Sequence, residues 1–141
     1  TDFSGKTAVM STSAGTCGII CAKKADEIVL GSFVCAKAVA DYILKKRPDT
    51  VTLVALGNAG LKKTDEDELC AAYIKELLQG KSPDEEYYLD RLRHSPDAQR
   101  FFDPAKKHSP EGDFYCASDL NRFDFVMKVQ RQGKYMEIIK E

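Results

Sequence analysis

The sequence predicts an α/β fold, a three-layer sandwich built on Rossmann-like parallel βαβ units. Three short apolar runs lie within residues 6–56, at residues 7–10, 28–30 and 51–56. Each run is bounded by glycine or polar residues, a pattern typical of strands that are buried on both faces of a sheet. Because a helical pattern follows each run, the three strands are expected to pair in parallel through right-handed crossovers.

Each of the three helical patterns repeats apolar side chains every three or four residues, which predicts one buried face per helix. The patterns begin near Cys17, Val34 and Cys70. The predicted faces are Cys17, Ile20, Cys21 and Lys24 in the first helix, Val34, Ala38, Val39, Tyr42 and Ile43 in the second, and Cys70, Tyr73, Ile74, Leu77 and Leu78 in the third.

The character of the chain changes after Gly80. Ser-Pro pairs at 82–83, 95–96 and 109–110 each offer an N-cap serine followed by proline at the first helical position. They predict one helix over 83–93 and shorter helical turns, with residues 100–113 as a polar surface excursion. Alternating apolar residues over 123–130 and a return over 135–139 predict a hairpin or two edge strands, which make the sheet mixed. Residues 1–141 are therefore expected to form a single α/β domain.

Composition narrows the class of function. The formal net charge is −1, from 21 basic and 22 acidic residues, which argues against nucleic-acid binding. No apolar run approaches the ~20 residues of a membrane span, and no signal peptide is visible. Five scattered cysteines indicate a reducing, cytoplasmic location with buried thiols. The chain does not begin with Met, so we expect a processed protein or a fragment.

Small polar residues follow all three predicted strands. Residues 11–16 (Ser-Thr-Ser-Ala-Gly-Thr) precede the first helix, Gly31-Ser32 precedes the second, and residues 57–68 carry an acidic run before the third. Ligands of parallel sheets bind beyond the carboxyl ends of the strands, where helices begin. Free N–H groups and the helix dipole favour an anion at the first turn, and the acidic run suits Mg²⁺.

Each of these segments also has an ordinary structural interpretation. The first is a capped turn whose hydroxyls accept hydrogen bonds from helical N–H groups. Thr64 and Asp67 have the spacing of a capping box, and acids in a first turn favour the helix dipole. Cys17 and Cys21 lack two further zinc ligands at a usual spacing. A thiol nucleophile at Cys35 would have no histidine near it in sequence.

Taken together, these segments resemble the 2-phosphosulfolactate phosphatase family, Mg²⁺-dependent phosphatases associated with coenzyme M biosynthesis. Residues 11–16 are similar to the family's S-T-T-N-G-T turn, and residues 31–34 (Gly-Ser-Phe-Val) precede an Ala-rich helix. Residues 66–71 are similar to its E-D-x-x-C-A-G segment, and residues 119–126 to its closing D-x-F-D-x-V stretch.

The resemblance implies hydrolysis of a phosphate monoester of a small anionic acid. It implies Mg²⁺ at Glu66 and Asp67, and a secondary phosphate contact at Ser32. The phosphate contacts that it implies in the first turn are Thr12, Ser13, Gly15 and Thr16.

The likeness covers the carboxyl-terminal part of the family pattern, so we expect the missing amino-terminal part to complete the site. Phe125 and Met127 are expected to contact that part or a second copy of the chain. Ala14 stands where the family usually has Asn, Cys35 where Asn is common, and Ala72 where Gly is usual. These departures motivate the alternative, a non-catalytic module that binds a small anion.

Overall fold

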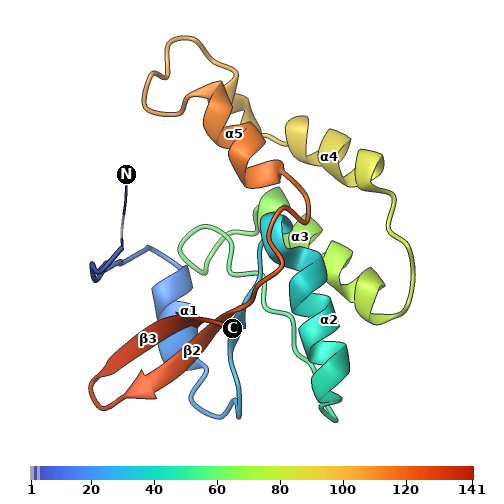
Figure 1. The fold of residues 1–141 in the computed structure, drawn as a ribbon. Helices are drawn as coiled ribbons and strands as arrows, with labels where there is room; N and C mark the ends of the chain where they lie inside the picture. Colours follow the sequence, from blue (N-terminus) through green and yellow to red (C-terminus); the bar gives the residue numbers. More distant parts are fainter. Residues whose placement is uncertain (1, 3) are drawn as a thin grey trace.

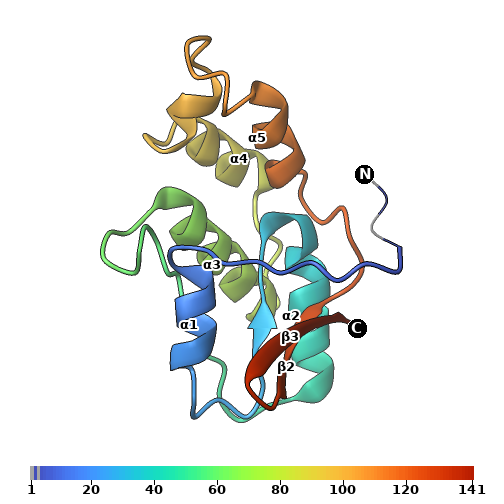
Figure 2. The ribbon, with the colours of Figure 1, turned by 90° about the vertical axis from the view of Figure 1, so that its left-hand side faces the viewer.

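The computed structural model describes residue 2 and residues 4–141, which form a mixed α/β fold (Figure 1). The α-helices are α1 (Gly15–Cys21), α2 (Ala36–Lys46), α3 (Asp65–Leu78), α4 (Glu85–Arg93) and α5 (Glu111–Ser118). Two 3₁₀ turns, η1 (Phe33–Cys35) and η2 (Ala98–Phe101), connect them, and the strands are β1 (Val29–Leu30), β2 (Met127–Gln132) and β3 (Tyr135–Lys140). Helices α4 and α5 lie at one end of the molecule and the β2–β3 hairpin at the other (Figures 1 and 2).

The sheet has the order β1-β2-β3, and both of its strand pairs are antiparallel. The hairpin turns at Gly133, whose φ of +57° suits glycine. Val29 pairs with Lys128 and Leu30 with Met127, so the short central run of the sequence joins the carboxyl-terminal hairpin. The predicted hairpin is therefore confirmed, whereas β1 finds an antiparallel neighbour.

The other two predicted strands do not form in the part of the chain that the structure describes. Residues 7–10 and 51–56 have no strand partner, and Val9 and Val54 are 96% and 68% exposed. In Figure 2 the amino-terminal segment runs as an open coil across the end of α1. The predicted Rossmann-like three-layer sandwich is therefore not confirmed, because a parallel strand needs a paired neighbour and helices over both faces.

The core centres on Tyr73 of α3, which is 1% exposed. Its ring packs edge-to-face against Phe33 and Tyr88, at centroid distances of 6.2 and 5.2 Å. Its hydroxyl donates to Glu85 Oε1 at 3.1 Å and accepts from Asn121 Nδ2 at 2.9 Å. One side chain thus links α3 to η1, to α4 and to the segment that leads into β2.

The amino-terminal boundaries of the later helices differ in detail from the prediction. Asp84, and not Ser82, caps α4, because its carboxylate accepts the Tyr87 N–H at 3.2 Å. Asp97, and not Ser95, is the N-cap residue of η2, although the Ser95 hydroxyl accepts the Ala98 N–H at 3.2 Å. The predicted surface excursion over 100–113 begins with two aromatic residues, Phe101 and Phe102, that pack on the core. Only its central part is the exposed polar loop that the composition predicts.

The cysteines are less buried than we predicted from the apolar residues that surround them in the sequence. Cys35 is buried and Cys70 half-buried, but Cys17, Cys21 and Cys116 are exposed. The face of α1 that was expected to be covered is open, since Ile20 is also 53% exposed. Burial, together with the nearby Cys35 and Asp67, raises the pKa of the Cys70 thiol from 9.0 to about 12.

Replacing Tyr73 by Phe is expected to lower the free energy of unfolding by about 1–2 kcal/mol, because a buried hydroxyl with two partners is lost. Urea denaturation followed by circular dichroism measures the change. Tyr87→Phe, which alters a half-exposed tyrosine of α4, is the matched control and should change stability by less than ~0.5 kcal/mol. Equal effects of the two substitutions would contradict the role given to the Tyr73 hydroxyl.

When the native chain is modified with Ellman's reagent at pH 8, the cysteines are expected to react at clearly different rates. The raised pKa of Cys70 keeps its thiol protonated up to about pH 12, so its thiolate fraction is small. Cys70 should react roughly 100-fold or more slowly than the exposed Cys17, as mapped by mass spectrometry, and at an ordinary rate in urea. Labelling of native Cys70 as fast as that of Cys17 would contradict this assignment.

Candidate functional site

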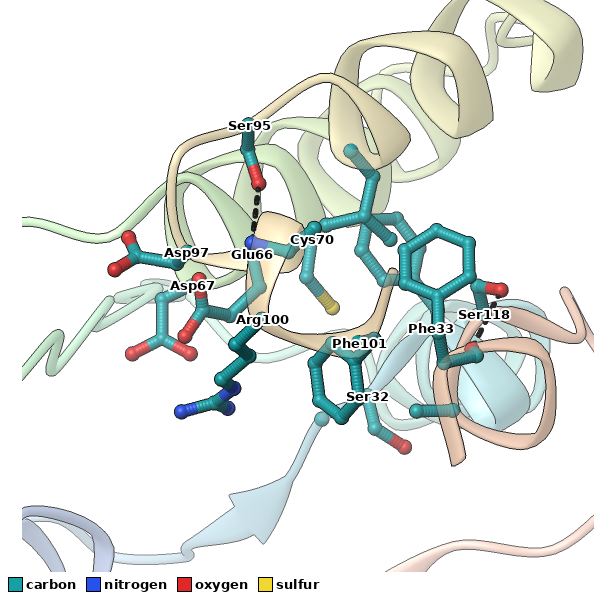
Figure 3. Close-up of a pocket in the computed structure, with 15 residues that line it drawn as sticks. Ser32, Phe33, Glu66, Asp67, Cys70, Ser95, Asp97, Arg100, Phe101 and Ser118 are labelled. Atoms are coloured by element: carbon teal, nitrogen blue, oxygen red, sulfur yellow. Dashed lines mark hydrogen bonds between the residues drawn. The ribbon is translucent and has the colours of Figure 1, made fainter. Parts of the chain in front are cut away.

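A cavity of about 270 Å³ lies where the β1–η1 connection, the amino-terminal half of α3 and the α4–α5 arm meet (Figure 3). The volume is close to the lower limit of ~300 Å³ for small-molecule sites, so it suits a small ligand. The charged residues of the wall are Glu66, Asp67, Asp97 and Arg100, and the predicted contact Ser32 also lines it. The remaining lining residues are Gly31, Phe33, Cys70, Leu92, Ser95, Ala98, Phe101, Phe114, Ala117 and Ser118.

Gly31 allows Ser32 to approach α3. A Cβ atom at Gly31 would lie 3.0 Å from Cδ1 of Ile74, a buried residue of α3. Because glycine has no side chain there, the end of β1 packs directly on α3 and sets Ser32 in the cavity wall. The Ser32 hydroxyl lies 3.2 Å from Sγ of Cys35, in the turn that follows. Ser32 and the acids of α3 are thus brought together from segments more than 30 residues apart.

Asp67 has a bonding partner that the sequence analysis did not predict. Its Oδ2 accepts the N–H of Gly57 at 2.6 Å. Gly57 adopts φ +60°, and a Cβ there would lie 2.1 Å from the Lys62 carbonyl oxygen, so glycine is required at this turn. The Asp67 carboxylate therefore fixes the start of the 57–62 loop, while Glu66, from the same turn of α3, also lines the cavity.

The capping box expected from Thr64 and Asp67 does not form. Thr64 precedes α3 but makes no side-chain cap, and its Oγ1 is buried without a partner among the described atoms. The Asp67 carboxylate reaches Gly57 instead. Capping-box geometry therefore does not account for Asp67, although an acidic first turn still favours the helix dipole.

Arg100 is the basic side chain of the cavity, and the sequence analysis missed it. Its guanidinium carbon lies 4.8 Å from the centroid of the Phe101 ring, a cation–π contact that orients the group. Within residues 2 and 4–141, no carboxylate forms an ion pair with Arg100. In the view of Figure 3, the guanidinium lies at the same end of the cavity as Glu66 and Asp67.

The first polar turn lies outside this cavity wall. Thr12 Oγ1 accepts the N–H of Thr16 at 3.2 Å, and the Thr16 hydroxyl donates to the Thr12 carbonyl at 2.9 Å. Ser13 is exposed, and Gly15 begins α1. The predicted phosphate contacts Thr12, Ser13, Gly15 and Thr16 therefore form a turn closed by its own hydroxyls, while Ser32, Glu66 and Asp67 share the cavity.

Mg²⁺ asks for few protein ligands, usually one or two carboxylates with waters and a substrate phosphate. Glu66 and Asp67 supply two carboxylates in one cavity, and Asp67 engages a single oxygen with Gly57. Among the described residues no group of three or more His, Cys, Asp and Glu side chains is arranged to hold a metal ion. The pair thus fits a magnesium ion that is completed by water and substrate, and does not fit an all-protein cage.

The cavity contains no candidate thiol nucleophile. The raised pKa keeps Cys70 protonated at neutral pH, and Cys35 is 1% exposed. Neither histidine contributes to the cavity wall; His94 pairs with Asp90 at the end of α4, its Nδ1 lying 3.2 Å from the carboxylate. The cavity's chemistry therefore rests on carboxylates, a hydroxyl and a guanidinium.

None of the described helices has the length and apolarity that crossing a membrane requires.

Comparison with known proteins gives one consistent result. The family model for 2-phosphosulpholactate phosphatase matches residues 1–132. A probable 2-phosphosulfolactate phosphatase of Caldicellulosiruptor saccharolyticus is 42% identical over 92 residues, which cover 62% of this chain and 37% of that protein. A probable 2-phosphosulfolactate phosphatase of Bacillus subtilis is 28% identical over 137 residues, or 94% of this chain and 58% of that protein.

No solved structure matches the chain significantly. The alignments span less than two thirds of the length of either curated relative. Because the family model extends over nearly the whole chain, the chain belongs to the 2-phosphosulpholactate phosphatase family.

Proposed function

We propose that this chain supplies part of the active site of a Mg²⁺-dependent phosphatase that hydrolyses the phosphate monoester of a small anionic acid such as 2-phosphosulfolactate. Family membership supports a phosphatase. The observation that carries the proposal is the cavity itself, in which Ser32 from the β1–η1 connection meets Glu66 and Asp67 of α3. By the same inference the protein acts in the cytoplasm, in coenzyme M biosynthesis or a related use of sulfonated acids.

Glu66 and Asp67 would hold the magnesium ion, directly or through water. A bound Mg²⁺ neutralises charge on phosphoryl oxygens and helps to orient or activate an attacking water. The cavity wall carries three carboxylates and one guanidinium, so it is negatively charged before any ion binds. An anionic ester enters such a site only with a cation, because the unscreened carboxylates repel it.

The phosphoryl group would be contacted by Ser32 and by the turn that contains Thr12, Ser13, Gly15 and Thr16. The Ser32 hydroxyl is a donor for a phosphoryl oxygen once it leaves Cys35. The turn's Thr12–Thr16 hydrogen bonds would be exchanged for bonds to the ligand. The departures at Ala14 and Cys35 are what motivate the alternative, a non-catalytic module that binds a small anion.

The remaining length of the family's proteins would complete both the site and the sheet. The open side of the chain is apolar: Val9, Ile20 and Val54 are all more than half exposed. Residues 7–10 and 51–56 carry buried-strand patterns but lack strand partners. Pairing of these segments with further chain would produce the Rossmann-like three-layer sandwich and bring the first turn to the sheet edge. Alternatively, a second copy of the chain could cover this apolar face.

Phosphatase assays with and without Mg²⁺ test the proposal, using this chain and the longest protein that its gene encodes. The longer protein is expected to hydrolyse 2-phosphosulfolactate in the presence of Mg²⁺. Glu66→Gln and Asp67→Asn should each lower kcat/KM by roughly 100-fold, because they remove charge from the metal site. Asn at position 67 keeps an acceptor for the Gly57 N–H, so the loop should survive.

The matched control is Glu68→Gln, from the same acidic run, whose carboxylate pairs with Lys63 at 3.4 Å and does not line the cavity. It should leave kcat/KM within about twofold of the unmodified protein. If the Asp67→Asn enzyme kept full Mg²⁺-dependent turnover, the result would contradict metal binding by Asp67 and assign the acidic run a structural role. Failure of the longer protein to hydrolyse a broad panel of phosphate esters would refute the enzyme and favour the binding module.

The thiols of α1 test how the open side is covered. Cys17 and Cys21 are exposed in this chain. In the longer protein, we expect their modification rates to fall at least about tenfold, because packed chain excludes the reagent. Cys116, exposed in α5 away from that face, is the control and should keep its rate. Unchanged rates at Cys17 and Cys21 would contradict covering of this face by further chain.

A further inference from the structure

We propose that Arg100 binds the second acid group of the substrate, the carboxylate or sulfonate that is not transferred. This inference rests on the proposed function and deepens it by assigning a specificity-determining residue. Arg100 belongs to η2, a segment whose sequence carries no recognisable site motif. Its assignment comes from the tertiary structure alone.

The first argument is charge. Among the residues that line the cavity, Arg100 is the basic one, facing the carboxylates of Glu66, Asp67 and Asp97. A magnesium ion held by two carboxylates leaves no positive charge in excess for a second anionic group on the substrate. Arg100 is the basic residue of the wall, and is therefore the one that can neutralise that group.

The second argument is availability. Arg100 is an exposed side chain, so water can satisfy its five N–H donors until a ligand displaces it. Arg100 forms no ion pair with any described residue, although acids line the same cavity. Its guanidinium instead stacks on Phe101, at 4.8 Å from the ring centroid. The N–H donors in the guanidinium plane are therefore open to a ligand while the cation–π contact limits the side chain's freedom.

The third argument is placement. A small acid phosphorylated on the carbon next to its acid group presents both anionic groups within a few bonds of each other. Both groups must then be bound at one end of the cavity. The guanidinium of Arg100 and the carboxylates of Glu66 and Asp67 lie at the same end in Figure 3, whereas Phe33 and Ser118 lie at the other. A planar guanidinium matches carboxylate or sulfonate oxygens with two parallel hydrogen bonds.

The test compares two esters that differ in the second acid group. 2-Phospholactate carries a carboxylate, and isopropyl phosphate has a methyl group in its place. Binding of each to this chain is measured by isothermal titration calorimetry in Mg²⁺. Arg100→Ala should weaken binding of 2-phospholactate by about 10- to 100-fold, the usual effect of losing a charged hydrogen-bond pair. Its effect on isopropyl phosphate should stay below about twofold, because the phosphoryl group is held elsewhere.

Arg93→Ala is the matched control. Arg93 is also exposed and stacked on an aromatic ring, 5.4 Å from the Phe102 centroid, but it does not line the cavity. It should change neither affinity, and Arg100→Lys should restore part of the preference, since lysine keeps the charge without the planar fork. Thermal melting of each variant checks that the fold is retained.

The outcomes separate this inference from the function on which it rests. Equal loss of affinity for both esters in Arg100→Ala would assign Arg100 to the phosphoryl group and overturn the inference. So would no loss for either ester. Binding of isopropyl phosphate as tightly as 2-phospholactate by the unmodified chain would overturn it while leaving a phosphate site. Binding of neither ester by the unmodified chain would overturn the role given to Arg100 in this chain, whereas the proposed function is decided separately by the phosphatase assay of the longer protein.

Discussion

The hydroxyl of Tyr73 and the amide of Asn121 meet at the point where most of the structure is joined. Asn121 donates to that hydroxyl at 2.9 Å and accepts the Lys37 N–H, at the start of α2, at 2.8 Å. The same loop bonds η1, since the Asn121 N–H donates to the Phe33 carbonyl at 3.0 Å. Buried polar groups are stable only when paired, so these contacts specify one arrangement. Because η1 follows Ser32 directly, this network also positions the cavity wall.

The chemistry of the cavity comes from charged side chains that the fold places in a largely apolar space. Carboxylates from α3 and one guanidinium from η2 line a largely apolar space. Charges in such a space interact strongly and demand partners. Asp67 accepts the Gly57 N–H, which also fixes the loop before α3. Among the described residues, Arg100 contacts the Phe101 ring and forms no ion pair. The cavity wall therefore presents charges of both signs, as the proposed roles of the acids and of Arg100 require.

The two sides of the chain differ in how far their apolar side chains are buried. On one side α2, α3 and α5 enclose a core of aromatic and aliphatic residues. On the other, α1 and the runs at 7–10 and 51–56 leave large apolar side chains in solvent. Burial of such side chains contributes roughly 1.5–3 kcal/mol each, so covering of this face, as proposed above, would be favourable. The runs at 7–10 and 51–56 carry a buried-strand pattern, but they form no strand pairs among the described residues.

The sequence by itself determined the α/β class, the helices that carry apolar stripes, the carboxyl-terminal hairpin and the likeness to the phosphatase family. Those features depend on local periodicity, turn residues and short motifs, which all involve residues that are close together in the sequence. Only the tertiary structure decided that β1 pairs antiparallel with β2, that Asp67 binds Gly57, and that Arg100 enters the cavity. These depend on which distant segments pack together. The polar loops expected at one edge therefore separate, with Ser32 and the α3 acids in one cavity and the first turn outside it, because no neighbouring strand holds that turn in place.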